Sequence, residues 1–156
     1  MFVPKNLEEF IEIDASPAAV WAIASDLTRM PEWSPQTRKT IIRGGPIGEG
    51  SLMINLNRSG IKVWPTRSKV VAFEPEQRIA WKIRENHAIW SFELESMDDG
   101  TRTKLIERRD VSGDTTKLSK TLIDKFMSGE TAFEQDLAIG MRQTLQRIRR
   151  AAESAS

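Results

Sequence analysis

The chain has 156 residues, of which 39% are hydrophobic and 29% charged, a balance that predicts one soluble globular domain over residues 1–156. Its 23 Lys and Arg residues offset 22 Asp and Glu residues, so overall charge gives no reason to expect nucleic-acid binding. The absence of cysteine excludes disulfides and thiol nucleophiles. Without a signal-peptide pattern or a membrane-length apolar run, we expect a cytoplasmic protein with no membrane span.

The first strand is predicted over residues 6–14, where apolar and acidic side chains alternate. Phe10 interrupts the alternation, which predicts that the strand is covered on both faces near its middle. The expected core-facing residues are Leu7, Ile11 and Ile13.

Two short helices are predicted to follow this strand. Ser16 can cap the free backbone N–H groups of the first helix, and Pro17 suits its first turn. Asp26 can cap the second, whose length is limited by Pro31 and Pro35. The sequence therefore predicts a helical corner between the first strand and the rest of the sheet.

Residues 37–111 are predicted to form six strands separated by turns. Asp98-Asp99-Gly100 favours a tight hairpin, and Glu85-Asn86-His87 a second one. Pro65 interrupts the strand predicted over residues 61–73, which indicates an edge or a bulge there. The alternation of apolar and polar residues indicates an antiparallel sheet with one apolar face and one wet face. The alternating apolar series are Leu52, Ile54 and Leu56; Ile79, Trp81 and Ile83; and Trp90, Phe92 and Leu94.

A long helix is predicted over residues 114–151, because apolar side chains recur there every three or four positions. Gly129 is expected to kink or break it. The part from residue 131 to 150 would run about 30 Å, enough to cross a small sheet. Arginines at its end, including Arg142 and Arg147, suit the helix dipole.

A sheet with one apolar face and a long amphipathic helix must bury these faces against each other, which predicts an α+β fold. The order of elements resembles the helix-grip fold of the SRPBCC superfamily, which includes the birch-pollen-allergen, START and polyketide cyclase/dehydrase proteins. The resemblance is carried by Ile11 to Trp21 with Met30 to Pro35, by Val70 to Trp81, and by Trp90 to Asp110.

This resemblance implies a curved antiparallel sheet of about seven strands, two short helices, and a long C-terminal helix over the concave face. It also implies an apolar cavity between sheet and helix, which related proteins use for lipids, polyketides or sterols. Some members are aromatase/cyclases or dehydratases, but no catalytic motif of theirs can be carried over to this chain.

The expected cavity lining comes from the inward residues of the sheet and the inner stripe of the helix, where aromatic rings would present flat surfaces to a ligand. The alternative is that these side chains only fill the core. The candidates are Trp64, Trp81, Trp90, Phe92, Leu94, Leu105, Phe126, Phe133, Leu137 and Met141.

Glu107 and Arg109 share the parity of Leu105, so all three would face inward together. A buried Glu–Arg pair is costly unless its polar atoms are satisfied, and it could therefore anchor a ligand carbonyl or carboxylate. The alternative places both side chains in water beyond the cavity. Arg67 offers a weaker version of the same argument, and His87, the single histidine, is a rim candidate for acid–base chemistry.

Three functions remain open from the sequence. The first is binding of a hydrophobic small molecule, without a cofactor or metal, by a monomer or homodimer. The second is a polyketide cyclase/dehydratase-like enzyme in which Glu107, with Arg109 or His87, protonates a carbonyl. The third is an interaction module with an apolar groove. One histidine and no cysteine leave only carboxylates as further metal ligands, so no metal site is expected.

Overall fold

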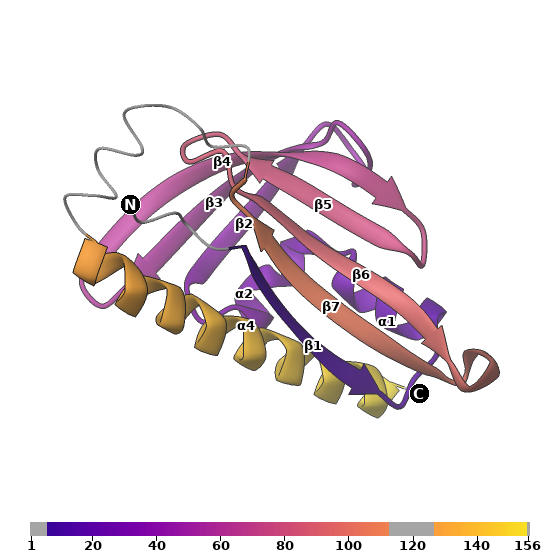
Figure 1. Ribbon diagram of the computed structural model, residues 1–156. Coiled ribbons are helices and arrows are strands. Elements are labelled where there is room, and N and C mark those ends of the chain that lie inside the picture. The colour runs from indigo at the N-terminus through magenta and orange to yellow at the C-terminus, as the bar shows by residue number, and fades with distance from the viewer. Residues whose placement is uncertain (1–5, 113–126, 156) are drawn as a thin grey trace.

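The computed structural model describes residues 6–112 and 127–155, and the side chains of 6–112 and 134–155. A curved sheet wraps around one long helix (Figure 1), which confirms the predicted α+β helix-grip fold. The elements are β1 (Leu7–Ile13), α1 (Pro17–Ala24), the 3₁₀ helix η1 (Leu27–Arg29), α2 (Met30–Trp33), β2 (Thr37–Arg43), β3 (Leu52–Ser59), β4 (Lys62–Glu74), β5 (Arg78–Ile83), β6 (Ile89–Met97), the 3₁₀ turn η2 (Asp98–Gly100), β7 (Arg102–Asp110) and α4 (Met127–Ala155).

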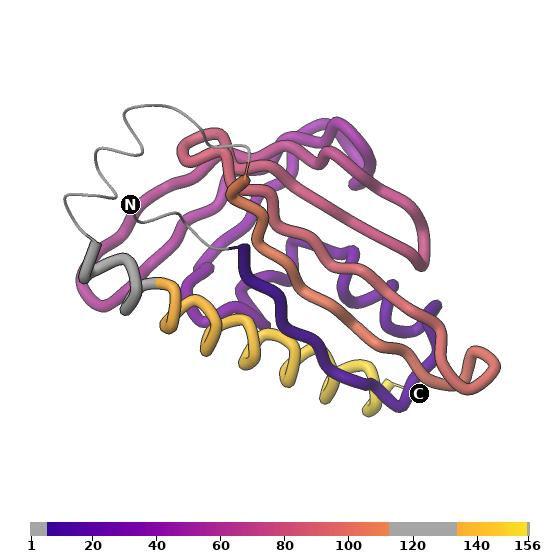
Figure 2. Tube along the Cα trace, in the orientation of Figure 1, coloured from indigo at the N-terminus to yellow at the C-terminus, as the bar shows by residue number. Residues whose placement is uncertain are grey.

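The described strands form one antiparallel sheet in the order β1-β7-β6-β5-β4-β3-β2. From β2 to β7 each strand pairs with the next one along the chain, and the N-terminal strand β1 then pairs with β7. In the tube view, β1 lies beside β7 while α4 runs along the same end of the sheet (Figure 2). This register sets which side chains share the concave face.

The core lies between the concave face and the helices. Inward positions of the sheet and the inner stripe of α4 supply most of it, because both elements bury one apolar side against the other. Its largest fully buried side chains include Ile13, Val20, Leu27, Ile79, Phe92, Leu105, Leu145 and Ile148.

The predicted helix signals are present at the corner after β1. The Ser16 hydroxyl accepts a hydrogen bond from the Ala19 N–H at 3.2 Å, and Pro17 begins α1. Asp26 caps η1 by accepting from the Thr28 N–H at 3.2 Å. Trp33 ends α2 and is buried, which fixes this corner against the core.

Pro65 lies where β4 extends past β5. Residues 62–67 of β4 pair through the ladder with β3, while the Cα register with β5 begins only at Ser68. The stretch around Pro65 is therefore a local edge on the β5 side, where a missing N–H is tolerated, although β4 as a whole is an inner strand. The bulge of β4 lies elsewhere, between Val70 and Ala72.

Helix α4 continues through Gly129, so the predicted break there was wrong, while the alternative of a kink stays a prediction. The predicted start of this helix, at residue 114, lies outside the described residues. Two arginines have more specific roles than complementing the dipole. Arg147 donates to the Trp33 carbonyl at 3.0 Å, and Arg142 to Glu9 at 3.1 Å, so they attach α4 to α2 and β1.

Two expectations about facing were wrong. Phe10 is 59% exposed on the outer face of β1, so this strand is covered on one side only. On β3, Leu52, Ile54 and Leu56 point outward, while Met53 and the two asparagines point inward, so the apolar series lies on the outer face. A pattern of period two separates the faces of a strand but does not say which face meets the core.

Candidate functional site

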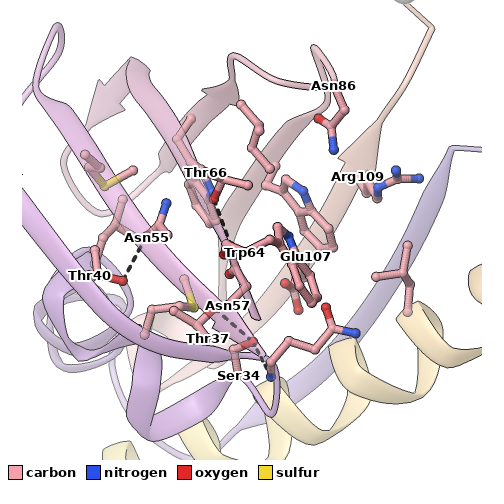
Figure 3. A pocket seen from close by; sticks show the side chains of 18 residues that line it. Ser34, Thr37, Thr40, Asn55, Asn57, Trp64, Thr66, Asn86, Glu107 and Arg109 are labelled. Atoms are coloured by element: carbon pink, nitrogen blue, oxygen red, sulfur yellow. Dashed lines mark hydrogen bonds between the residues drawn. The ribbon is translucent and has the colours of Figure 1, made fainter. Parts of the chain in front are cut away.

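A cavity of about 180 Å³ lies between the concave face of the sheet and helices α2 and α4. Strands β2 to β7 all contribute side chains to it (Figure 3). The lining divides into an aromatic wall, a polar wall and an acidic side chain on β7, the strand next to β6.

The aromatic wall comes from inward positions on three neighbouring strands. Trp64 on β4, Trp81 on β5 and Trp90 on β6 line the cavity, and all three are among the ligand-binding candidates named from the sequence. Trp81 and Trp90 are directly opposite across the β5–β6 ladder. Trp81 also rests on Phe92, with ring centroids 5.6 Å apart and the planes tilted by 54°. The wall therefore has a rigid backing of packed rings.

The polar wall belongs to β2, β3 and β4, opposite the tryptophans of β5 and β6. The Thr40 hydroxyl donates to Asn55 Oδ1 at 2.9 Å, and Asn57 Nδ2 donates to Thr66 Oγ1 at 3.0 Å. Asn55 Nδ2 in turn donates to the Ser68 hydroxyl at 3.2 Å. These bonds hold the amides and hydroxyls in fixed orientations on the cavity side (Figure 3).

Sequence reasoning missed this polar wall because it took Leu52, Ile54 and Leu56 as the inward series. A usable signal was present in the β3–β4 hairpin. Asn57 is directly opposite Trp64 across the turn, so the two must share a face. Placing Trp64 inward therefore also places Asn57 inward.

Glu107 on β7 lies in the cavity and is only 4% exposed. Its neighbours across the ladders are Phe92 on β6 and Glu9 on β1. Among the described residues, its Oε1 atom has no hydrogen-bond partner. Burial, and secondly the nearby Glu9 carboxylate, raise the pKa of Glu107 well above its usual value. The cavity thus holds a carboxyl group that resists ionisation and has a free polar atom.

The expected Glu107–Arg109 ion pair does not form. Both side chains line the cavity, but the Arg109 guanidinium lies over Trp90, 5.9 Å from the ring centroid, and points away from Glu107 in Figure 3. Arg67 points outward and pairs with Glu85 at 3.3 Å, so its inward reading was wrong. Of the three carboxylate and arginine candidates, only Glu107 is fully buried beside the aromatic wall.

The other candidate residues occupy different places. Leu137 lines the cavity, while Phe92, Leu94 and Leu105 are buried in the core behind it. Met141 lines the mouth described below. The side chain of Phe133 and all of Phe126 lie outside the described residues. His87 is exposed in the β5–β6 turn on the outer side, away from this cavity.

A second hollow, of about 390 Å³, opens between α4, the start of β2 and the β3–β4 hairpin. It shares Ser34, Gln36, Trp90, Glu107 and Leu137 with the inner cavity. The shared residues make it the mouth of that cavity, with Glu107 between the two. A ligand that reached the tryptophans by this route would pass the carboxyl group.

Among the residues whose side chains the structure describes, 6–112 and 134–155, no three His, Asp or Glu side chains gather as a metal site would require. The described helices include none that is long and apolar enough to cross a membrane.

Comparison with known proteins agrees with this architecture. The profile of the family described as polyketide cyclase / dehydrase and lipid transport matches residues 5–153. No curated protein matches the sequence. Among solved structures, the fold is similar to the Zhui aromatase/cyclase from Streptomyces sp. R1128, with a TM-score of 0.74 and 16% identity over 96% of this chain and 93% of that chain.

Two further structures extend the likeness. The Polyketide_cyc-like protein Cgl2372 from Corynebacterium glutamicum is 27% identical, with a TM-score of 0.64 over 97% of this chain and 94% of its own. Ara h 8.0201 is 17% identical, with a TM-score of 0.64 over 96% of this chain and 98% of its own. The class is therefore the helix-grip fold. Within it, this chain belongs to the polyketide cyclase/dehydrase and lipid transport family.

Proposed function

We propose that the protein binds a hydrophobic, ring-containing small molecule that carries at least one carbonyl or similar oxygen. The observation behind this proposal is the cavity lining, which combines three tryptophans, a wall of amides and hydroxyls, and the buried carboxyl of Glu107. A purely aliphatic ligand would leave the buried Oε1 atom of Glu107 without a hydrogen-bond partner, which costs free energy.

The size of the cavity favours one ring or a small fused system in the inner chamber. A cavity of about 150 Å³ is known to accept a benzene-sized molecule, and the inner chamber is slightly larger at about 180 Å³. The mouth, at about 390 Å³, has room for the remainder of a longer ligand. Rings would stack on the tryptophans while oxygens met the polar wall.

Glu107 supplies the polar contact that fixes the ligand. Its raised pKa keeps the carboxyl protonated to higher pH than an ordinary glutamate, so it can donate an O–H bond to a carbonyl oxygen. Asn57 and Thr66 are already bonded to each other, whereas the fully buried Oε1 atom of Glu107 has no hydrogen-bond partner among the described residues.

Ligand panels can test this proposal. Purified protein is titrated with a hydroxylated aromatic ketone such as a flavonoid, and with naphthalene as the carbonyl-free match, while tryptophan fluorescence is followed. We expect the ketone to bind below millimolar concentration. Glu107→Leu should weaken the ketone about tenfold, by loss of one hydrogen bond, and leave naphthalene within about twofold. Glu95→Gln, exposed on β6, is the matched control.

Failure of both ligands to bind a folded sample contradicts the proposal. An equal loss for both ligands in Glu107→Leu would mean that Glu107 shapes the cavity rather than recognising an oxygen.

A second candidate function is acid–base catalysis on a polyketide-like substrate, favoured by the raised pKa of Glu107 beside an open mouth. In a dehydration of a β-hydroxy ketone, solvent water would take the proton from the α-carbon, and the protonated carboxyl would give its proton to the β-hydroxyl. The C–O bond then breaks, water leaves, a C=C bond forms, and the carboxylate regains its proton from solvent. Glu107→Gln keeps a hydrogen-bond donor but has no transferable proton. We expect this variant to retain ketone binding and to lose at least about 100-fold of any dehydration of a β-hydroxy ketone, measured by product absorbance. Equal turnover by both proteins would exclude Glu107 as the acid.

A further inference from the structure

The outer face of the sheet carries an unusual set of exposed aliphatic side chains. They gather on β2, β3 and β4, at the opposite side of the strands from the cavity, because β3 directs its leucines and isoleucine outward. Leu52 is 56% exposed and Val63 57%. The aliphatic members are Ile41, Leu52, Ile54, Leu56, Val63 and Val71.

Cations surround these side chains. These cations lie at outward positions on β2, β4 and β5, and one of them directly follows β5. The strand register places Leu52 opposite both Arg43 and Lys69, and Lys69 opposite Lys82. We call the aliphatic residues and these cations together the outer patch. Its cations are Lys39, Arg43, Arg67, Lys69, Lys82 and Arg84.

Few acidic groups offset this charge among the described residues. Glu85 borders the outer patch and is occupied by Arg67, while Glu49 lies in the loop before β3. The far half of the same face differs, since Arg108 is paired with both Glu8 and Glu93. A chain of formal net charge +1 thus concentrates unbalanced positive charge on one half of one face.

The surface between the cations is hollowed. A depression of about 760 Å³ is lined by Leu52, Ile54 and Val71, with Arg43, Lys69, Lys82 and Arg84 also in its lining. His87 lies at its border on the β5–β6 turn. Long cationic side chains therefore surround apolar residues at the base of the depression. This arrangement suits a binding partner with negative charge at its surface and hydrocarbon beneath it.

The β3–β4 hairpin extends this surface at one end. Ile61 at its tip is 97% exposed, and Lys62 follows it. Arg58, Ser59 and Gly60 of the same hairpin line the mouth of the cavity. The outer patch and the mouth are therefore joined through one hairpin.

We propose that the outer patch and the tip of the β3–β4 hairpin dock on a membrane surface that contains anionic lipids. The cations would meet lipid phosphates while Ile61, Val63 and Leu52 enter the boundary between headgroups and acyl chains. This proposal does not depend on which molecule the cavity binds.

A membrane fits better than the two other occupants. A second copy of the chain would bring the cations of two outer patches together, which opposes symmetric pairing. An acidic partner helix would cover only a narrow stripe. The exposed aliphatic residues instead spread over three strands, each about 4.8 Å from the next, and along the length of β3, which is roughly 26 Å. The separate tip at Ile61 also suits insertion into a continuous layer.

Vesicle sedimentation tests the proposal directly. The protein is mixed with vesicles of phosphatidylcholine alone, or with an equal part of phosphatidylglycerol, at about 50 and about 300 mM salt. We expect binding to the anionic vesicles only, and much less of it at the higher salt. Lys69→Glu and Lys82→Glu should each weaken it about tenfold. Arg150→Glu on α4 changes net charge equally and should leave binding within about twofold.

A double variant, Leu52→Thr with Ile54→Thr, tests the aliphatic part, because threonine is more polar but is β-branched and suits a strand. It should weaken vesicle binding about tenfold with an unchanged circular-dichroism spectrum. Three results would overturn the proposal: no sedimentation of folded wild type with anionic vesicles, an equal loss for Arg150→Glu, or tight binding to polyglutamate without vesicle binding. The last would indicate an acidic protein partner instead.

Discussion

Glu107→Gln is expected to make the protein more stable at neutral pH and to remove a pH dependence that the wild type has. An unfolded glutamate titrates near pH 4.3, whereas burial and Glu9 raise the pKa of Glu107 in the folded state. Between these two pKa values the folded state binds more protons than the unfolded state. The free energy of unfolding therefore falls as pH rises through this interval and levels off above the folded-state pKa.

The neutral amide introduced by this substitution cannot ionise, so the variant should keep the stability that the wild type loses. We expect its free energy of unfolding to exceed that of the wild type by about 1–3 kcal/mol at pH 8, with the difference shrinking toward pH 4. Urea unfolding at unit steps from pH 4 to 8 measures this.

Groups with lowered pKa values act in the opposite direction and in a different range. Burial alone would raise the pKa of Glu85, but bonds from the Arg67 backbone and side chain outweigh it and lower that pKa, and the Ser112 hydroxyl lowers the pKa of Asp110. Their contributions are present above the unfolded pKa values and are lost as pH falls, so they are complete over most of the interval from pH 4 to 8. Glu95→Gln, at an exposed position, serves as control and should run parallel to the wild type. A parallel curve for Glu107→Gln as well would mean that the carboxyl is already satisfied.

Phe92→Ala is expected to destabilise the fold by about 3–5 kcal/mol, the usual cost of deleting a buried phenylalanine. Phe92 is 0% exposed on β6, and its ring supports Trp81 behind the cavity. The substitution removes the buried apolar surface and leaves a void that the neighbouring β5 and β7 side chains fill only in part. A domain of this size has a total stability of roughly 5–15 kcal/mol, so the melting temperature should fall by roughly 10 °C.

Phe10→Ala provides the matched comparison for this prediction. Phe10 is 59% exposed on the outer face, where its ring lies 4.4 Å from the Lys104 ammonium. We expect its loss to cost about 0.5 kcal/mol or less, because little buried surface changes. Urea unfolding of both variants gives the two numbers. Similar costs for the two phenylalanines would contradict the assignment of Phe92 to the core.

The lining of the cavity indicates which ligands the proposed binding site would favour. The three tryptophans offer flat apolar surfaces, but the hydrogen-bonded asparagines and threonines make one wall polar. A site that pairs ligand oxygens discriminates more strongly than an apolar pocket, because a ligand without them leaves buried groups unpaired. Glu107 is the group on which this discrimination would depend.

Local features of the fold could be predicted because they depend on nearby residues. Ser16 and Pro17 favour the start of a helix through local capping and backbone geometry. Asp98-Asp99-Gly100 tolerates the positive φ angles of a tight turn. Trp81 and Trp90 could be predicted to share a face because each lies in an alternating apolar series, and their two strands are joined by one hairpin. The resemblance to the helix-grip fold then supplied the long helix as their partner.

Tertiary structure alone decided the character of the site. The sequence shows that Leu52, Ile54 and Leu56 share a face of β3, but the pairing of β3 with β2 and β4 put that face outside and the asparagines inside. The closing of β1 onto β7 also brought Glu9 opposite Glu107, although the two residues lie near opposite ends of the sheet-forming sequence. Alternation defines two faces of a strand, whereas long-range pairing determines which face is covered. The polar wall, the buried carboxyl and the outer patch all follow from that pairing.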